Sequence, residues 1–197
     1  MRVFSTHEPT FWSVFLRLEE SEMTKIVTIT AGHSNTDSGA VNGSDRESDI
    51  AQDMRNIVAH YLRAEGITIR TDGEGKGNAS LNEAVKLIKG SSVAVEFHCN
   101  AGPKSAKGVE ALAQQKDKLI SQKLCSAVSS VMGIVVRGDK GWKPENSGQH
   151  SRLAYVSNGG IILELFFISN DEELKIWKDK KWLIGKEVAK VLSNYIS

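Results

Sequence analysis

Two histidines and two glutamates stand where a chain that only builds a fold would place other residue types. His33 lies within the turn-forming stretch AGHSNTDSGA, His98 ends the β-like run SVAVEFH, and Glu164 interrupts the apolar run GIILELFF. Glu47 is the fourth, near the start of an expected helix. Imidazole and carboxylate groups are zinc ligands, and a catalytic zinc site takes three of them and leaves one position for water. The remaining carboxylate then serves as general base and proton donor.

Glu47 has a structural explanation as well as a functional one. It falls in the first turn of a helix expected over 46–64, where a carboxylate stabilises the helix dipole. At about 100° per residue it also falls near the centre of the apolar stripe that contains Ile50, Met54 and Val58. A charge there is costly unless it is paired or bound to a metal. The dipole explains the position along the helix but not the orientation.

His98 and Glu164, the candidate residues within expected strands, also have both a structural and a functional explanation. Strand alternation places His98 and Glu96 on one face of their strand, opposite three apolar side chains. A single histidine is usually structural, but His33 and His98 both follow strands, and the carboxyl ends of strands are where open α/β sheets bind ligands. Glu164 is either paired with a Lys or Arg or placed for chemistry, and the sequence does not identify a partner.

The elements that must position these residues alternate along the chain. Strands are expected over 25–31, 67–71, 92–98, 108–113, 152–156 and 160–167. Helices are expected over 46–64 (capped by Ser44 or Asp45), 79–89, 116–132, 171–177 and 182–196. This alternation predicts a single α/β domain with a mostly parallel central sheet flanked by helices. The polar stretch 133–149 is expected to form a substrate wall.

Composition narrows the class of protein. The chain has 197 residues, 40% of them hydrophobic, which suffices for one domain with a sizeable core. A net charge of +1 favours neither nucleic acid nor a membrane surface as a partner. Cys99 and Cys125 are expected to be reduced thiols, and no apolar run is long enough for a membrane span. Residues 1–22 are expected to be an N-terminal extension of unknown role without a clear signal peptide, and 23–197 the folded domain.

Four segments together carry a family resemblance: AGHSNTDSGAVNGSDRES, VEFHCNAGPKSAKGVEAL, GIVVRGDKG and ILELFFISNDEEL. From about Lys25 to about Ile196 the chain resembles the zinc-dependent N-acetylmuramoyl-L-alanine amidases of the Amidase 3 type. The resemblance implies a phosphorylase/hydrolase-like fold, one zinc ion, and hydrolysis of the amide bond between N-acetylmuramic acid and L-alanine in peptidoglycan.

The resemblance also implies roles for single residues. By position in the family's motifs, the metal ligands are His33, Glu47 and His98, the catalytic residue is Glu164, and the supporting or substrate-binding residues are Asn100 and Arg137. The chain departs from the family's usual small residues or glycine at Ser34, Glu96, Cys99 and Phe166. None of these departures removes a ligand, but they change the wall of the expected pocket.

The biological setting follows as a set of expectations. The chain is expected to be an endolysin of a phage or prophage, made in the cytoplasm of the bacterial host and acting in bacteriolysis at the cell wall or periplasm. Peptidoglycan is the expected partner, without nucleic acid or stable membrane insertion, and the oligomeric state is left open. The alternatives are a zinc peptidase that cuts within the stem peptide and a non-catalytic wall-binding module.

Overall fold

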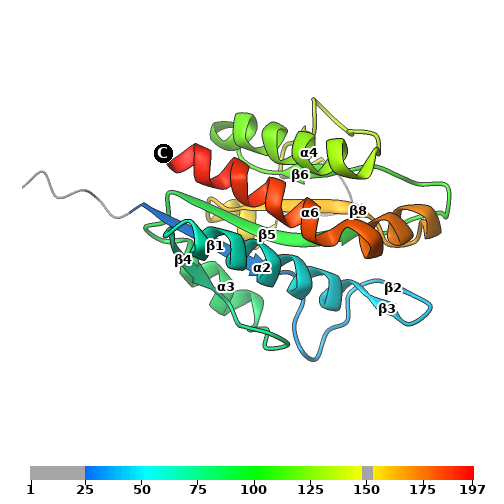
Figure 1. The fold of residues 1–197 in the computed structure, drawn as a ribbon, viewed down its shortest axis with the longest axis horizontal. Helices are drawn as coiled ribbons and strands as arrows, with labels where there is room; N and C mark the ends of the chain where they lie inside the picture. Colours follow the sequence, from blue (N-terminus) through cyan, green and yellow to red (C-terminus); the bar gives the residue numbers. More distant parts are fainter. Residues whose placement is uncertain (1–24, 148–152) are drawn as a thin grey trace, which may run out of the picture.

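A six-stranded sheet forms the centre of the computed structural model, which describes residues 25–147 and 153–197 (Figure 1). Its strands, in spatial order, are β4 (Thr68–Thr71), β1 (Ile26–Ala31), β5 (Val93–Asn100), β8 (Ile161–Phe167), β6 (Glu110–Leu112) and β7 (Trp142–Lys143). Neighbouring strands run parallel except β6 and β8, which are antiparallel. The predicted single α/β domain with a mostly parallel sheet is therefore confirmed.

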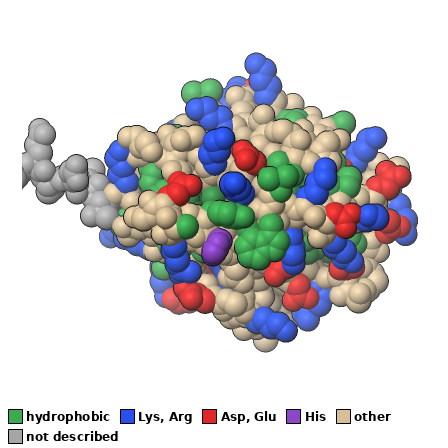
Figure 2. Space-filling model, in the orientation of Figure 1, with side chains coloured by type: hydrophobic (Ala, Val, Ile, Leu, Met, Phe, Trp, Pro, Cys, Tyr) green, Lys and Arg blue, Asp and Glu red, His purple; other side chains and the backbone are tan. Residues whose placement is uncertain are grey.

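Helices cover both faces of the sheet. One face packs against α2 (Glu47–Ala64), α4 (Lys118–Met132) and α6 (Asp171–Ile196), and the other against α3 (Leu81–Ile88) and α5 (Ala154–Ser157). The alternation of β5 serves these two layers, because Val95 and Phe97 join the larger core and Ala94 the smaller one. Figure 2 shows the face of α2, α4 and α6, on which positive and negative side chains are interspersed.

Several element boundaries differ from the expectation. The predicted strand over 152–156 is wrong, because the described part of that stretch forms the short helix α5, and a short apolar run does not distinguish helix from strand. The helices expected over 171–177 and 182–196 are one helix, α6, since the charged residues between them contain no helix breaker.

The start of α2 also differs. The helix begins at Glu47 with Arg46 at its N-cap, and no side chain caps it, so the caps predicted at Ser44 or Asp45 are wrong. The reason is a short hairpin of β2 (Val41–Asn42) and β3 (Asp45–Arg46), which takes up the residues that would have served as caps. The hairpin thereby places Glu47 directly at the junction between loop and helix.

A buried polar network, absent from the sequence-based expectations, fixes the end of β1. The Arg55 side chain is 0% exposed and donates to Asp72 (3.1 Å) and to Asn78 (3.0 Å). Asp72 accepts the backbone N–H of Ala31 at 3.1 Å, and Asn78 donates to the carbonyl of His33 at 3.2 Å. Buried charges are stable only when paired and hydrogen-bonded in this way. The network therefore holds the backbone from which His33 projects.

Both cysteines are free thiols buried in the protein, as predicted. Cys99 belongs to the larger hydrophobic core, and burial raises the pKa of its thiol well above the usual value. Within the described residues, no helix combines the length and the apolar character that crossing a membrane requires.

Candidate metal centre and pocket

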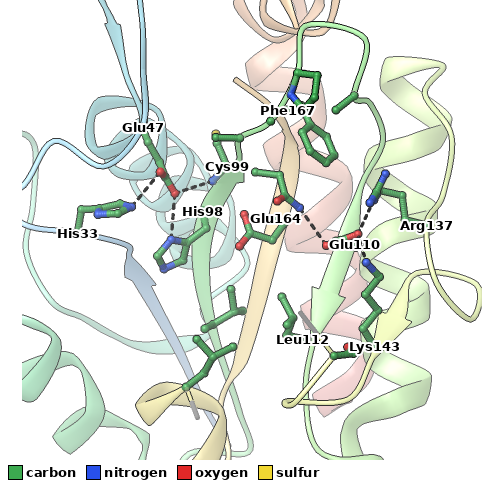
Figure 3. A pocket seen from close by; sticks show the side chains of 18 residues that line it. His33, Glu47, His98, Cys99, Glu110, Leu112, Arg137, Lys143, Glu164 and Phe167 are labelled. Atoms are coloured by element: carbon green, nitrogen blue, oxygen red, sulfur yellow. Dashed lines mark hydrogen bonds and ion pairs between the residues drawn. The ribbon is translucent and has the colours of Figure 1, made fainter. Parts of the chain in front are cut away.

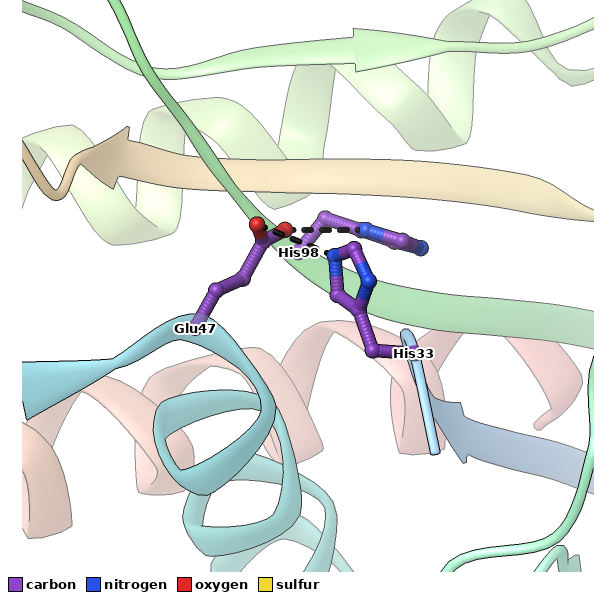
Figure 4. A group of neighbouring side chains, drawn as sticks. All are labelled: His33, Glu47 and His98. Atoms are coloured by element: carbon purple, nitrogen blue, oxygen red, sulfur yellow. Dashed lines mark hydrogen bonds and ion pairs between the residues drawn. The ribbon is translucent and has the colours of Figure 1, made fainter. Parts of the chain in front are cut away.

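Glu47 joins the two histidines that the sequence singled out (Figure 4). Its Oε2 lies 2.9 Å from Nε2 of His33, and its Oε1 lies 3.0 Å from Nδ1 of His98. One nitrogen or oxygen from each residue falls within 4.8 Å of the others. His33 comes from the loop after β1, Glu47 from the first turn of α2, and His98 from the carboxyl end of β5. The structure thus brings together residues that are up to 65 positions apart, and their role as metal ligands stays a prediction.

Two glycines make room for the histidine rings. A Cβ atom on Gly32 would lie 2.2 Å from the His98 ring, which is closer than atoms can approach. Gly39 has a φ of +61°, and its Cβ would lie 2.5 Å from Nε2 of His33. His33 itself adopts a φ of +67°, an uncommon conformation for a residue with a side chain. The small residues of the loop therefore allow its backbone to turn His33 toward Glu47.

The outer nitrogen of each imidazole is also bound to a carboxylate. Nδ1 of His33 lies 2.9 Å from Oδ2 of Asp37, and Nε2 of His98 lies 3.0 Å from Oε1 of Glu96. A neutral imidazole that donates its outer N–H presents the lone pair of its inner nitrogen. Carboxylates in this position orient metal-binding histidines and raise their basicity. Each ring can therefore offer the lone pair of its inner nitrogen to a metal ion once the proton that it shares with Glu47 is displaced.

Glu47 is buried but held as an anion. Burial alone would raise the pKa of its carboxyl group, but hydrogen bonds from His33 and His98 lower it well below the usual range. The backbone N–H groups of Ala40 and Cys99 each donate to the carboxylate at 3.0 Å. Burial alone would lower the pKa of His33 and His98, because it favours their neutral forms. The Glu47 carboxylate outweighs this effect and raises the pKa of both rings.

This donor set fits a zinc ion. Two imidazole nitrogens and one carboxylate oxygen are the ligands of several catalytic zinc sites, and three protein ligands leave a position for water. The ligand atoms converge, the outer nitrogens are bound to carboxylates, and Glu47 is ionised. The dipole interpretation of Glu47 does not account for this convergence on both histidines.

Glu164 lies beside this cluster. In the pairing of β5 with β8 it is the direct neighbour of His98. Its Oε2 is buried and has no hydrogen-bond partner among the described residues, and no Lys or Arg of this part of the chain forms an ion pair with it. Burial raises its pKa to about 7. A carboxyl group with a pKa near neutrality and an unused oxygen is suited to both accepting and donating a proton.

A second charged cluster lies on the other side of Glu164, in a pocket of about 640 Å³ (Figure 3). Glu110 accepts a hydrogen bond from Asn100 (3.0 Å) and forms ion pairs with Arg137 and Lys143. Asn100 and Arg137, expected as supporting residues, thus both line the pocket and both bind Glu110. Glu110 and Lys143 were missed, although a glutamate within the predicted strand GVEALA carries the same signal that singled out Glu164.

Other predictions about single residues have mixed outcomes. The stretch 133–149 was expected to form a substrate wall, and Arg137, Lys143 and Ser147 from its described part line the pocket. His60 is exposed, and its ring lies 5.9 Å from that of Trp182. His7 and His150 lie outside the described residues.

Replacing Glu96 with glutamine is expected to weaken zinc binding about tenfold to a hundredfold. Glu96 is only 3% exposed, and its negative charge on the outer nitrogen of His98 makes that ring a better electron donor. Glutamine keeps the size and loses the charge. Zinc affinity measured by competition with a chromophoric chelator checks this. Glu83→Gln, which removes an exposed carboxylate paired with Lys86, is the control, and equal affinities for both variants would contradict the role of Glu96.

The fold and the site together define a class of protein. A mostly parallel sheet flanked by helices, with a His–Glu–His cluster and an additional protonatable glutamate beside it, is suited to an enzyme of the α/β class that hydrolyses its substrate. The particular family follows from comparison with known proteins. The chain belongs to the Amidase_3 family of N-acetylmuramoyl-L-alanine amidases, whose model matches residues 27–194. The predicted family and enzyme class are thereby confirmed.

Similar structures agree with this assignment. A crystal structure from Neisseria meningitidis, assigned to the N-acetylmuramoyl-L-alanine amidases, is 56% identical, with a TM-score of 0.82 over 87% of this chain and 96% of that one. The catalytic domain of the amidase CwlV from Paenibacillus polymyxa is 21% identical, with a TM-score of 0.71 over 88% of this chain and 99% of that one, and shares the fold. The Bacillus subtilis protein YqiI is 29% identical over 160 residues, which is 76% of this chain and 73% of that protein.

Proposed function

We propose that this amidase hydrolyses the bond between N-acetylmuramic acid and L-alanine in peptidoglycan with the help of one zinc ion. The observation that carries the proposal is the convergence of His33, Glu47 and His98 next to the unpartnered carboxyl group of Glu164. Zinc in such a site supplies Lewis-acid chemistry, which polarises a carbonyl group and makes water more acidic.

The residues of the chain supply the remaining steps. Glu164 takes a proton from the attacking water on its carboxylate and delivers that proton to the nitrogen of the leaving alanine. Its pKa of about 7 allows both directions of transfer near neutral pH, where efficient acid–base catalysts titrate. Asp37 and Glu96 hold His33 and His98 in their orientations. The pocket has a volume of about 640 Å³ and is lined by polar and apolar side chains, so a fragment of the substrate fits into it.

The setting of the reaction follows from its substrate. Because peptidoglycan is the substrate of the proposed reaction, we expect the enzyme to act at the bacterial cell wall or periplasm. Production in the cytoplasm and an origin as a phage or prophage lysin that causes bacteriolysis stay predictions, as do the role of residues 1–22 and the limits 23–197 of the catalytic domain.

Digestion of purified peptidoglycan is expected to release stem peptides that begin with L-alanine and to leave glycan strands without peptides. Mass spectrometry of the soluble and insoluble fractions identifies both products. Fragments cut within the stem would instead support the peptidase alternative. A purified, zinc-loaded protein that binds the wall and releases nothing would support the non-catalytic module.

A further inference from the structure

The cluster of Glu110, Arg137 and Lys143 has a surplus of positive charge within the pocket. Arg137 and Lys143 both bind Oε2 of Glu110. Burial opposes ionisation of Glu110, but hydrogen bonds from Lys143, Arg137 and Asn100 outweigh it and lower its pKa. One anion therefore faces two cations, and the cluster carries a net charge of +1.

Both cations keep donors for a ligand. Lys143 has three N–H groups, and its one ion-pair partner among the described residues is Glu110. Arg137 donates from Nε to Glu110 and from Nη1 to the carbonyl of Lys107, and its Nη2 has no hydrogen-bond partner within the described chain. The guanidinium group lies over the ring of Phe167, 4.8 Å from the ring centre, which fixes the plane of its donors.

The position of Glu110, Arg137 and Lys143 relative to Glu164 determines which part of the substrate lies next to these three residues. Glu110 and Glu164 are direct neighbours in the pairing of β6 with β8, so their Cβ atoms lie about 5 Å apart. Figure 3 shows Glu110, Arg137 and Lys143 on the side of Glu164 that faces away from His98. A second pocket of about 330 Å³ shares His33 and His98 with the first, but Glu164 does not line it.

Because Glu164 delivers its proton to the leaving nitrogen, that nitrogen must lie next to Glu164. The stem peptide begins at this nitrogen and therefore extends into the pocket that Glu164 lines, toward the two cations. We propose that Arg137 and Lys143 form a subsite for a carboxylate of the stem peptide and make the enzyme prefer a stem whose second residue carries a free α-carboxylate over one that carries an α-carboxamide. This inference rests on the proposed function.

The test compares two substrates that differ only in this group, N-acetylmuramoyl-L-alanyl-γ-D-glutamyl-L-lysinamide and N-acetylmuramoyl-L-alanyl-D-isoglutaminyl-L-lysinamide, in which the γ-carboxyl group of the second residue is part of a peptide bond. The zinc-loaded enzyme is expected to show a kcat/KM at least about tenfold higher for the carboxylate, the effect of a charge-assisted hydrogen bond. Lys143→Met is expected to lose this preference by lowering kcat/KM for the carboxylate alone, and Lys143→Arg to retain most of it. Lys181→Met, which removes a partly exposed lysine paired with Asp53, is the matched control.

A binding measurement separates this proposal from the proposed function. Calorimetric titration with the free peptides L-alanyl-γ-D-glutamyl-L-lysinamide and L-alanyl-D-isoglutaminyl-L-lysinamide requires no turnover. Tighter binding of the carboxylate that is lost in Lys143→Met supports the subsite even if neither substrate is cleaved, a result that would overturn the amidase proposal alone. Cleavage of both substrates at equal kcat/KM, or an equal loss for both in Lys143→Met, would overturn the subsite alone.

Discussion

Replacing Glu164 with glutamine is expected to lower kcat by about two to four orders of magnitude while zinc stays bound. Glutamine has nearly the shape of glutamate, but it neither accepts a proton from water nor delivers one to the leaving alanine. The proposed zinc ligands His33, Glu47 and His98 are unchanged. The measurements are the initial rate on a muramyl peptide and the zinc content of the purified variant by atomic absorption.

The stability of this variant provides an independent check. Burial raises the pKa of Glu164 from 4.5 to about 7, so the folded metal-free protein loses stability as the pH rises between these values and the carboxyl group is forced to ionise. Glutamine does not ionise, and Glu164→Gln is therefore expected to unfold no more readily than the original protein in urea at pH 8. Glu172→Gln, at an exposed position in the first turn of α6, is the control for kcat. A rate near that of the original protein would exclude Glu164 as the proton carrier.

Removal of the metal is expected to abolish activity, and one equivalent of zinc to restore it. His33, Glu47 and His98 have no other function in the proposed reaction, and residual turnover without zinc should fall below the detection limit. Dialysis against a strong chelator, followed by titration with zinc and an assay at each step, measures this effect. A metal that only stabilises the fold predicts a different result, in which the melting temperature falls on chelation but activity at low temperature persists.

The affinity for zinc is expected to fall as the pH falls. In the metal-free protein the Glu47 carboxylate raises the pKa of both histidines above 6.5, so both rings are protonated below that pH. Zinc must displace these protons, and its affinity is expected to fall by up to about a hundredfold for each unit of pH below 6.5. Zinc titrations at two pH values below 6.5 check this. An affinity that does not change with pH would exclude the histidines as ligands.

Part of this site could be predicted because its signals are local. His33, Glu47, His98 and Glu164 each conflict with the turn chemistry, helix periodicity or strand alternation of their own segment, and these patterns depend on residues only a few positions away. The same local patterns predicted most strands and helices. They did not predict α5 or the hairpin before α2, because in short segments local preference is weak and packing decides.

The sequence by itself determined the α/β class, the mostly parallel sheet and the four residues expected to carry the chemistry, since periodicity and misplaced charges are properties of the chain. Only the tertiary structure decided which charges meet. The antiparallel strand β6 lies beside β8, and this order brings Glu110 next to Glu164 and allows Arg137 and Lys143 to bind it. The contact between Glu96 and His98, and the network of Arg55, Asp72 and Asn78, likewise depend on side-chain packing. Hydrogen bonds and ion pairs act over a few ångströms, so the sequence reveals them only once the fold has set those distances.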